Sequence, residues 1–286
     1  MKIKCPKCAT TAPNISKNGY FFRSSDSKKI QRYRCRLCKK EFSRATFSDC
    51  YLQKKRRLNF LIAKDLCSST SMRRIALNYR ISRTTVKRKL EFLSTQAKLK
   101  QRKWLKDREV KSNEIYFDDL ESFESTKYKP LTVSVAVEGK SRKILGFRVS
   151  PIGAKGLLSN MAKKKYGVRR NISYKARKDL FTELKSELDE NTTFKTDMHK
   201  DYPRLIREFF PKAQHKVYKS VRGSLTAQGE LKRTGFDPLF CINHVFAMLR
   251  DNIKRLSRKT WCNTKKMKYL EHHLNVYVHF HNTVLT

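Results

Sequence analysis

Apolar residues between positions 58 and 93 recur every three or four residues, the spacing of one face of a helix. They fall into three groups: Leu58, Leu61 and Ile62; Ile75 and Ala76; Val86, Leu90 and Leu93. This pattern predicts three helices, capped by a serine within residues 69–71 for the second and by Ser82 for the third. A short helix followed closely by a capped, basic helix is typical of a DNA-binding helix-turn-helix segment. An unspecialised helical linker is the alternative.

The start of the third predicted helix carries side chains suited to a DNA groove. They are Arg83, Thr84, Thr85, Lys87 and Arg88. Basic and hydroxyl groups donate hydrogen bonds to phosphates and to base edges. These five residues are therefore the predicted DNA contacts of this segment.

After Asn113 the pattern changes from helical to alternating and β-rich. Three consecutive antiparallel strands are predicted by the runs EIYFDDLESF (114–123), PLTVSVAVEG (130–139) and KILGFRVSP (143–151). Further on, the pattern predicts a helix over 174–188, strands over 192–197 and 214–218, and long helices over 239–258 and 266–281. This order resembles that of ribonuclease H-like domains, so we expect an α/β domain with a mixed sheet.

The first segment contains two C-x2-C pairs, CPKC and CRLC, separated by 26 residues. Each pair can form half of a tetrahedral zinc site, and two pairs complete it. The predicted zinc ligands are Cys5, Cys8, Cys35 and Cys38. Strands over ISKNGYFF and over the residues before CRLC would place the two pairs together, as in a structural zinc ribbon with one Zn²⁺.

Charge narrows the class of partner. The chain has 66 Lys plus Arg against 25 Asp plus Glu, a net charge of +41, which favours a polyanionic partner and most often nucleic acid. Residues 1–110 hold 31 basic and 7 acidic side chains, so this part is the denser binder. A ribosomal or RNA-packaging protein is the alternative that composition leaves open.

The expected organisation is multidomain. It comprises a zinc ribbon over 1–50, an all-α helix-turn-helix domain over 54–100 and the α/β domain over 111–286, with a basic insertion at 151–173. An apolar run of 18 residues and the apolar core of a signal peptide are both missing, so we expect a cytoplasmic protein without disulfides or membrane contact.

Two aspartates are predicted to meet in the sheet. Asp118 lies in the first strand and Asp197 at the end of the fourth, positions that are neighbours in this strand order. Two carboxylates repel each other unless a cation lies between them, and a divalent metal supplies that charge. Two Mg²⁺ roughly 4 Å apart can promote phosphodiester displacement. The alternative is two separate carboxylates paired with nearby lysines.

The whole chain except 151–173 resembles bacterial insertion-sequence transposases, in particular the family of insertion sequence one and its zinc-ribbon relatives. The likeness is carried by the ribbon, the helix-turn-helix, the stretch DMHKDY (197–202) and the R-x4-RL-x-RKT stretch (250–260). The resemblance implies a D-D-E site that holds two Mg²⁺, for which Mn²⁺ can substitute. It also implies cleavage and strand transfer of double-stranded DNA by a homodimer or larger assembly at the nucleoid.

Carried onto this sequence, the resemblance implies Asp118 and Asp197 as metal ligands, with Asp119 beside the first. The family's glutamate position, seven residues before Arg250, holds Asn243. An amide oxygen is a weaker ligand, since it contributes no charge. His244 and Asp251 are the substitutes to weigh, although Asp251 lies about 80° away around the helix.

Basic side chains near the end of the chain complete the predicted DNA path. Arg250 resembles a residue that contacts DNA near the cut, and Arg255, Arg258 and Lys259 lie in the run KRLSRK. The runs KKKY (163–166) and VRRN (168–171) are further predicted phosphate contacts, with a solvated surface as the alternative.

The sequence therefore predicts a transposase that binds element ends and catalyses Mg²⁺-dependent strand cleavage and transfer. A catalytically inactive, sequence-specific DNA-binding protein, such as a decayed transposase or a repressor, is the rival that Asn243 keeps open. No small-molecule substrate is expected. Of the four acids in FDDLESFE, Asp118 is the predicted ligand, while Glu121 and Glu124 are predicted to have no part in the site.

Overall fold

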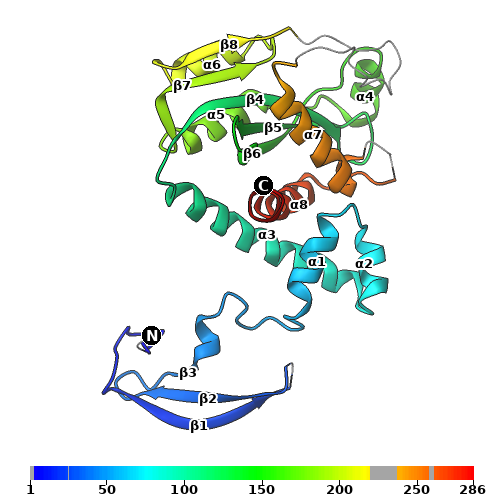
Figure 1. The fold of residues 1–286 in the computed structure, drawn as a ribbon. Coiled ribbons are helices and arrows are strands. Elements are labelled where there is room, and N and C mark those ends of the chain that lie inside the picture. The colour runs from blue at the N-terminus through cyan, green and yellow to red at the C-terminus, as the bar shows by residue number, and fades with distance from the viewer. Residues whose placement is uncertain (1–2, 25, 220–236, 258–260) are drawn as a thin grey trace. The chain divides into compact units, whose positions relative to one another are not determined.

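The structure is a computed structural model that describes residues 3–24, 26–219, 237–257 and 261–286 (Figure 1). Contacts along the chain divide it into two units, Met1–Leu61 and Ile62–Thr286. The units are described separately below. The finer domain boundaries stay predictions.

The first unit is built on a three-stranded antiparallel sheet in the order β1-β2-β3. Its elements are β1 (Ile15–Arg23), β2 (Lys28–Cys35), β3 (Glu41–Ser43) and the 3₁₀ helix η1 (Arg44–Phe47). The two strands predicted around the cysteine pairs are thus confirmed. The small buried core of this sheet consists of Cys5, Tyr33, Cys35 and Phe42. One cysteine of each pair therefore packs in the same cluster as the aromatic side chains.

Three helices follow, as the apolar spacing predicts: α1 (Leu58–Leu66), α2 (Met72–Asn78) and α3 (Arg83–Lys106). Both predicted caps are confirmed, because Ser71 Oγ accepts from the Arg74 N–H and Ser82 Oγ accepts from the Thr85 N–H. At 24 residues, α3 continues past residue 100, where the helix-turn-helix domain was expected to end. Neither Gly nor Pro interrupts it, and Leu90, Ala97 and Leu105 continue one buried face.

The second unit contains a five-stranded mixed sheet in the order β6-β5-β4-β7-β8. Its strands are β4 (Ser112–Phe123), β5 (Pro130–Glu138), β6 (Ile144–Pro151), β7 (Leu188–Thr196) and β8 (Gln214–Val217). β4, β5 and β6 are antiparallel, whereas β7 pairs in parallel with both β4 and β8. The predicted α/β class and mixed sheet are therefore confirmed.

Helices lie on both faces of this sheet. The helical elements that follow α3 along the chain are α4 (Leu158–Tyr166), α5 (Ser173–Leu184), α6 (Tyr202–Phe209), α7 (Phe240–Asn252), η2 (Lys254–Leu256), α8 (Met267–Phe280) and the terminal turn η3 (His281–Leu285). Phe117 of β4 packs with Phe181 of α5 and Tyr202 of α6. Tyr116 points to the opposite face, where α7 crosses β4 and β5 (Figure 1). α5 ends four residues before the predicted helix does, because Leu188 begins β7.

A polar seam joins α3 to α8. Tyr269 Oη donates to Glu91 Oε1 at 2.9 Å, and Ser94 Oγ accepts from Asn275 Nδ2 at 3.1 Å. Ser94 Oγ also lies 2.9 Å from His272 Nδ1. Because these contacts come from successive turns of both helices, they fix the register of α3 along α8.

The end of the chain holds α3 to the sheet edge. Asn282 Oδ1 accepts from the Ile144 N–H at 2.9 Å, and Asn282 Nδ2 donates to the Ile144 carbonyl at 2.8 Å. Gln101 Nε2 donates to the same carbonyl at 3.0 Å. The amide of Asn282 thus satisfies backbone groups that the edge strand β6 would otherwise leave unpaired.

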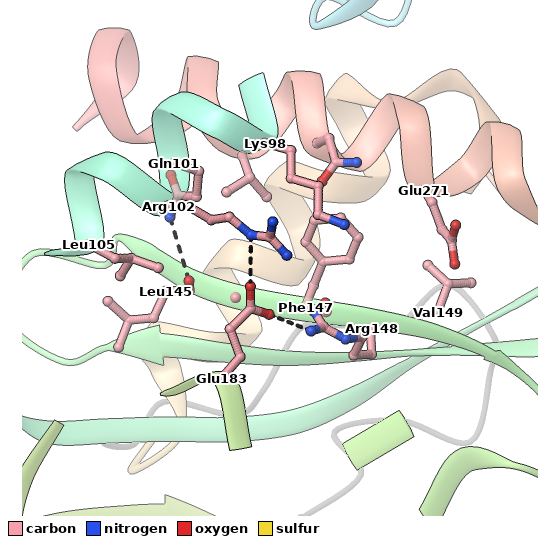
Figure 2. A pocket seen from close by; sticks show the side chains of 13 residues that line it. Lys98, Gln101, Arg102, Leu105, Leu145, Phe147, Arg148, Val149, Glu183 and Glu271 are labelled. Carbon is pink, nitrogen blue, oxygen red and sulfur yellow. Dashed lines mark hydrogen bonds and ion pairs between the residues drawn. The ribbon is translucent and has the colours of Figure 1, made fainter. Parts of the chain in front are cut away.

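A pocket of about 240 Å³ lies between α3, α5, β6 and α8 (Figure 2). Arg102 of α3 and Arg148 of β6 both pair with Glu183 of α5 there. Burial opposes the ionised form, but these two guanidinium groups lower the pKa of Glu183. The pocket is therefore crossed by an ion-pair bridge that links three elements.

In the part of the chain that the structure describes, the longest helices are too polar, and the apolar ones too short, to cross a membrane.

His273 of α8 gives the fold a pH-dependent stability. It is 3% exposed, its Nε2–H donates to the Leu66 carbonyl at 2.7 Å, and burial lowers its pKa to about 4. The unfolded chain binds this proton near pH 6.5 but the folded chain does so only near pH 4, so stability falls as the pH drops through that window. The amide of His273→Gln can still donate the hydrogen bond but binds no proton. On going from pH 7 to acidic pH, this variant should therefore lose less free energy of unfolding than the parent chain, by up to roughly 3 kcal/mol.

The comparison is the free energy of unfolding in urea, measured for both chains at pH 7, 5.5 and 4.5. The other histidines remain in both, so the difference between the two curves belongs to His273. Parallel curves would refute this role.

Candidate functional site

The register of the central strands brings Asp118 and Asp197 together. β4 and β7 are parallel, and Phe117 of β4 is paired with Thr196 of β7. Asp118 and Asp197 are the next residues along each chain. Two aspartates 79 residues apart in sequence therefore lie side by side at one end of the pairing, as the strand order predicts.

Asp118 is a half-buried carboxylate in a region of negative charge. Its Oδ1 accepts from the Asp119 N–H at 2.7 Å and lies 3.5 Å from Tyr202 Oη. Burial, reinforced by the negative charge of Asp197, raises the pKa of Asp118 to about 7. The ionised form is disfavoured unless a positive charge comes close.

Asp119, the next residue, points to the opposite face of β4 and meets Arg177 of α5. The guanidinium is 3% exposed, and its Nη2 and Nε donate to Asp119 Oδ2 at 2.5 and 3.1 Å. Its Nη1 donates to Asp201 Oδ2 at 2.8 Å. Arg177 therefore neutralises Asp119 and ties β4 to the segment that follows Asp197.

That segment is folded around the same arginine. Asp197 Oδ1 accepts from the His199 N–H at 3.0 Å, and the His199 ring stacks on Tyr202 with centroids 4.7 Å apart. The Arg177 guanidinium lies 5.3 Å from the centre of the Tyr202 ring. Burial, with the nearby Arg177 charge, lowers the pKa of His199 and favours a neutral imidazole.

Sequence reasoning missed Arg177 and gave Tyr202 no role. A signal for Arg177 exists, since the buried stripe of α5 runs Ser173, Ala176, Arg177, Leu180, Phe181 and Leu184. An arginine inside an apolar stripe needs a carboxylate partner. The sequence alone does not say which of the 25 acids provides it.

The predicted third ligand, Asn243, lies on α7, which packs against β4. Its Nδ2 donates to Asp237 Oδ2 at 2.9 Å. Of the two amide atoms only Oδ1 can bind a cation, and the bond to Asp237 fixes which way the amide points. The substitutes fit less well: Asp251 is exposed at the end of α7, and the His244 ring lies beside Phe240 with centroids 5.7 Å apart.

The predicted DNA contacts divide into exposed and internal groups. Arg83, Thr84, Lys87 and Arg88 are exposed at the start of α3. Thr85 is half-buried, and its hydroxyl lies 2.9 Å from Ser82 Oγ in the helix cap. The Lys87 ammonium lies 5.3 Å from the centre of the Tyr269 ring, so it also contacts α8.

Two of the C-terminal basic residues predicted to contact DNA, Arg250 and Arg255, are half-buried. Arg250 is half-buried in the last turn of α7. Arg255 lies 3.4 Å from Thr264 Oγ1 and 3.8 Å from the Met72 sulfur, and burial lowers its pKa. Its contacts thus connect α2 to the segment before α8. Arg258 and Lys259 lie outside the described residues.

The other acids of FDDLESFE have cationic partners of their own. Glu121 pairs with Lys155 at the surface. Glu124 Oε2 accepts from Arg169 at 3.2 Å, and Glu124 Oε1 accepts from the Met267 N–H at the start of α8 at 2.9 Å. Glu124 is therefore an anchor between β4, the 151–173 insertion and α8, a structural role that the sequence did not indicate.

The four cysteines of the ribbon are gathered as a metal site requires. Their sulfur atoms all lie within 4.8 Å of one another, with 3.5 Å from Cys5 to Cys38 and 3.6 Å from Cys8 to both Cys35 and Cys38. Sulfurs at the corners of a tetrahedron around Zn²⁺ would lie about 3.8 Å apart, given a Zn–S distance near 2.3 Å. The donor set and its spacing therefore fit zinc.

The electrostatics of this cluster favour thiolate at two positions. Burial works against it, but backbone N–H groups of Cys8 and Lys7 lower the pKa of Cys5 to about 6. A backbone hydrogen bond from Cys38 likewise lowers the pKa of Cys35. Thiolates are the form that binds metal. Within the described ranges, no other group of three or more His, Cys, Asp or Glu side chains is gathered this way, so Asp118 and Asp197 form a pair only.

No family model matches the chain, and no curated protein matches it. Among solved structures the chain is similar to one titled "Crystal structure of the Mos1 Strand Transfer Complex". The identity is 10%, the TM-score is 0.26, and the match covers 80% of this chain and 75% of that chain. A TM-score this low does not establish a shared fold, so functional inference rests on the site itself.

Asp118→Asn tests the buried charge. Because the pKa of Asp118 is about 7 when folded and near 3.9 when unfolded, the folded chain holds an extra proton between these values. Stability therefore falls as the pH rises from about 4 to about 7. In metal-free buffer at pH 8, we expect Asp118→Asn to raise the melting temperature by roughly 3–10 °C, with little gain at pH 4.

The matched control is Glu190→Gln, an exposed acid on the strand that leads to Asp197, paired at the surface with Lys212. It should leave the melting temperature unchanged. A lower melting temperature for Asp118→Asn at pH 8 would contradict the assignment of an unfavourable charge.

The cysteine cluster predicts one zinc ion per full-length chain. Cys35→Ser removes a buried ligand, so the purified variant should lose the zinc that elemental analysis finds in the parent chain. Cys262→Ser, a half-buried cysteine outside the cluster, should retain it. Full zinc content in Cys35→Ser would rule out this ligand set.

Proposed function

We propose that this protein is a transposase, an enzyme that binds DNA and cuts and joins its strands with the help of divalent cations. The observation that carries the proposal is the pairing of the half-buried Asp118 with Asp197 across β4 and β7, in a chain of net charge +41. Two adjacent carboxylates that, among the described residues, have no cationic side chain between them suit Mg²⁺. The net positive charge of the chain suits a polyanionic substrate.

In this proposal Asp118, Asp197 and the Oδ1 atom of Asn243 would hold the ions. When bound, Mg²⁺ supplies the charge that activates a hydroxyl and stabilises a leaving oxygen at phosphorus. Tyr202 Oη, 3.5 Å from Asp118 Oδ1, helps to orient that carboxylate. Arg177 holds Asp119 on the other face of the strand, where the guanidinium pairs with the Asp119 carboxylate.

The rest of the proposed architecture follows the sequence. The order of strands and helices after residue 111 supports a ribonuclease H-like catalytic domain of the insertion-sequence type, and the exposed start of α3 supports a helix-turn-helix that reads element ends. The cysteine cluster supports a zinc ribbon. Two ends must be held together during transposition, so we propose a homodimer or larger assembly on the DNA.

A sequence-specific DNA-binding protein without catalytic activity is the second candidate. Asn243 favours it, because a neutral amide replaces the charge of a third carboxylate. In this case the exposed basic residues of α3 would still bind DNA, while Asp118 and Asp197 would be remnants of a site.

Strand cleavage separates these two candidates. The substrate is a supercoiled plasmid that carries the gene with its native flanking DNA, incubated with the full chain and Mg²⁺ or Mn²⁺. We expect the nicking rate to fall by at least roughly 100-fold in both Asp118→Asn and Asp197→Asn. Loss of a residue that merely supports a metal ligand can already reduce activity by that factor. Glu190→Gln should nick as the parent chain does.

Electrophoretic mobility shifts on the same flanking DNA complete the test. Retained binding by the two aspartate variants supports a catalytic role for both residues. Specific binding by the parent chain without nicking in either metal would overturn the enzyme in favour of the inactive DNA-binding protein.

A further inference from the structure

A second cavity, separate from the aspartate pair, lies between the turn after β4 and the 151–173 insertion. Its volume is about 380 Å³, within the range of ligand pockets. Side chains that line it include Tyr128, Lys129, Lys163, Tyr166, Arg169 and Arg170. Glu124, also in the lining, is six residues beyond Asp118 on an extended strand, or about 20 Å away.

Two tyrosines give this cavity an aromatic wall. The ring centroids of Tyr128 and Tyr166 are 6.2 Å apart, and Tyr166 is 42% exposed. The Lys129 ammonium lies 4.4 Å from the centre of the Tyr166 ring, which holds the ring in place from one side. Tyr128 Oη points to the Met161 sulfur at 3.8 Å, which orients the second ring. An accessible aromatic face of this kind can stack on a planar ligand.

The charge of the lining is strongly positive. The insertion carries six basic residues and no acidic one. Glu124 is the one acid of the lining, and its two oxygens are occupied by Arg169 and by the Met267 N–H. Lys163 and Arg170 are exposed and, among the described residues, form no ion pair. Both remain available to an anion.

An anion and a planar ring in one ligand describe a nucleotide. We propose that this cavity binds an unpaired nucleotide of a DNA strand, with the base against Tyr166 and a neighbouring phosphate on Lys163 and Arg170. Base stacking on aromatic side chains combined with basic groups along the backbone is the general means of holding single strands. The choice of a DNA strand over a free nucleotide rests on the proposed function, whereas the nucleotide chemistry rests on the cavity alone.

The test compares two fluorescein-labelled probes by fluorescence anisotropy with the full chain. One probe is a blunt 20-base-pair duplex, and the other is the same duplex with a four-nucleotide 3′ overhang. We expect tighter binding of the overhang probe. Tyr166→Ala should reduce that preference by roughly 5- to 150-fold, up to its complete loss, because stacking on one base contributes about 1–3 kcal/mol. Affinity for the blunt duplex should not change.

Three controls keep the result specific. Tyr166→Phe retains the ring and should keep the preference, which excludes a loss of fold as the cause. The double variant Lys163→Ala, Arg170→Ala should also lose the overhang preference, while Lys185→Ala, an exposed lysine at the end of α5, should not. Equal affinity of the parent chain for both probes, or unchanged preference in Tyr166→Ala, would overturn the inference.

Competition identifies the source of the nucleotide. Millimolar dAMP should displace the overhang poorly if the cavity takes part of a strand. If dAMP displaced the probe as effectively as a single-stranded oligonucleotide does, the ligand of the cavity would be a free nucleotide, and the assignment to a DNA strand would be overturned. The anisotropy measurement does not depend on cleavage. Overhang preference without nicking would uphold this inference and contradict the proposed enzyme. Nicking without overhang preference would support the proposed enzyme and overturn this inference.

Discussion

The ion pairs of Arg177 are the constraint on which the acidic site depends. A guanidinium that is 3% exposed must be paired, because removing one partner of a buried ion pair costs about 3–5 kcal/mol. Its partners, Asp119 and Asp201, come from β4 and from the segment after β7. Arg177 of α5 thus holds the backbone next to Asp118 and the backbone that follows Asp197 in fixed positions relative to each other. The site is held by a side chain that the proposed chemistry never uses.

The same constraint explains why one acid of FDDLESFE differs from the rest. Asp119, Glu121 and Glu124 each have a cationic side chain as partner. Asp118, in the described part of the chain, has instead a tyrosine hydroxyl, a backbone N–H and the charge of Asp197. The chain has 66 Lys and Arg, so a carboxylate that pairs with none of those the structure describes is a costly arrangement for stability. Such an arrangement is expected where a cation from outside the protein has to bind.

Periodicity predicted elements well because each strand or helix carries its own pattern. The five strands of the sheet, the helix over 266–281 and the serine caps at Ser71 and Ser82 were predicted from local sequence and are confirmed. The helix predicted over 239–258 ends earlier, at Asn252, because the backbone of Ile253 is extended. The aspartate pair followed from strand order. What local pattern could not supply was pairing between distant side chains: Arg177 with Asp119, or Glu124 with Arg169. The length of α3 was missed for a related reason, since its last turns are stabilised by contacts with α8 and β6 rather than by a local signal.

The length of α3 has a consequence for how DNA reading and chemistry would be linked. Its first turn presents Arg83 and Arg88 to solvent, while further along the same helix Ser94 contacts α8 and Gln101 contacts the edge of the sheet. A continuous helix transmits position far better than a flexible linker, because each residue adds a fixed rise of about 1.5 Å. Within residues 62–286, the predicted reading surface and the aspartate pair therefore belong to one framework. In the proposed function, a strand cut at this site would lie at a set distance from the bases contacted by α3, and the fold would determine the place of the cut.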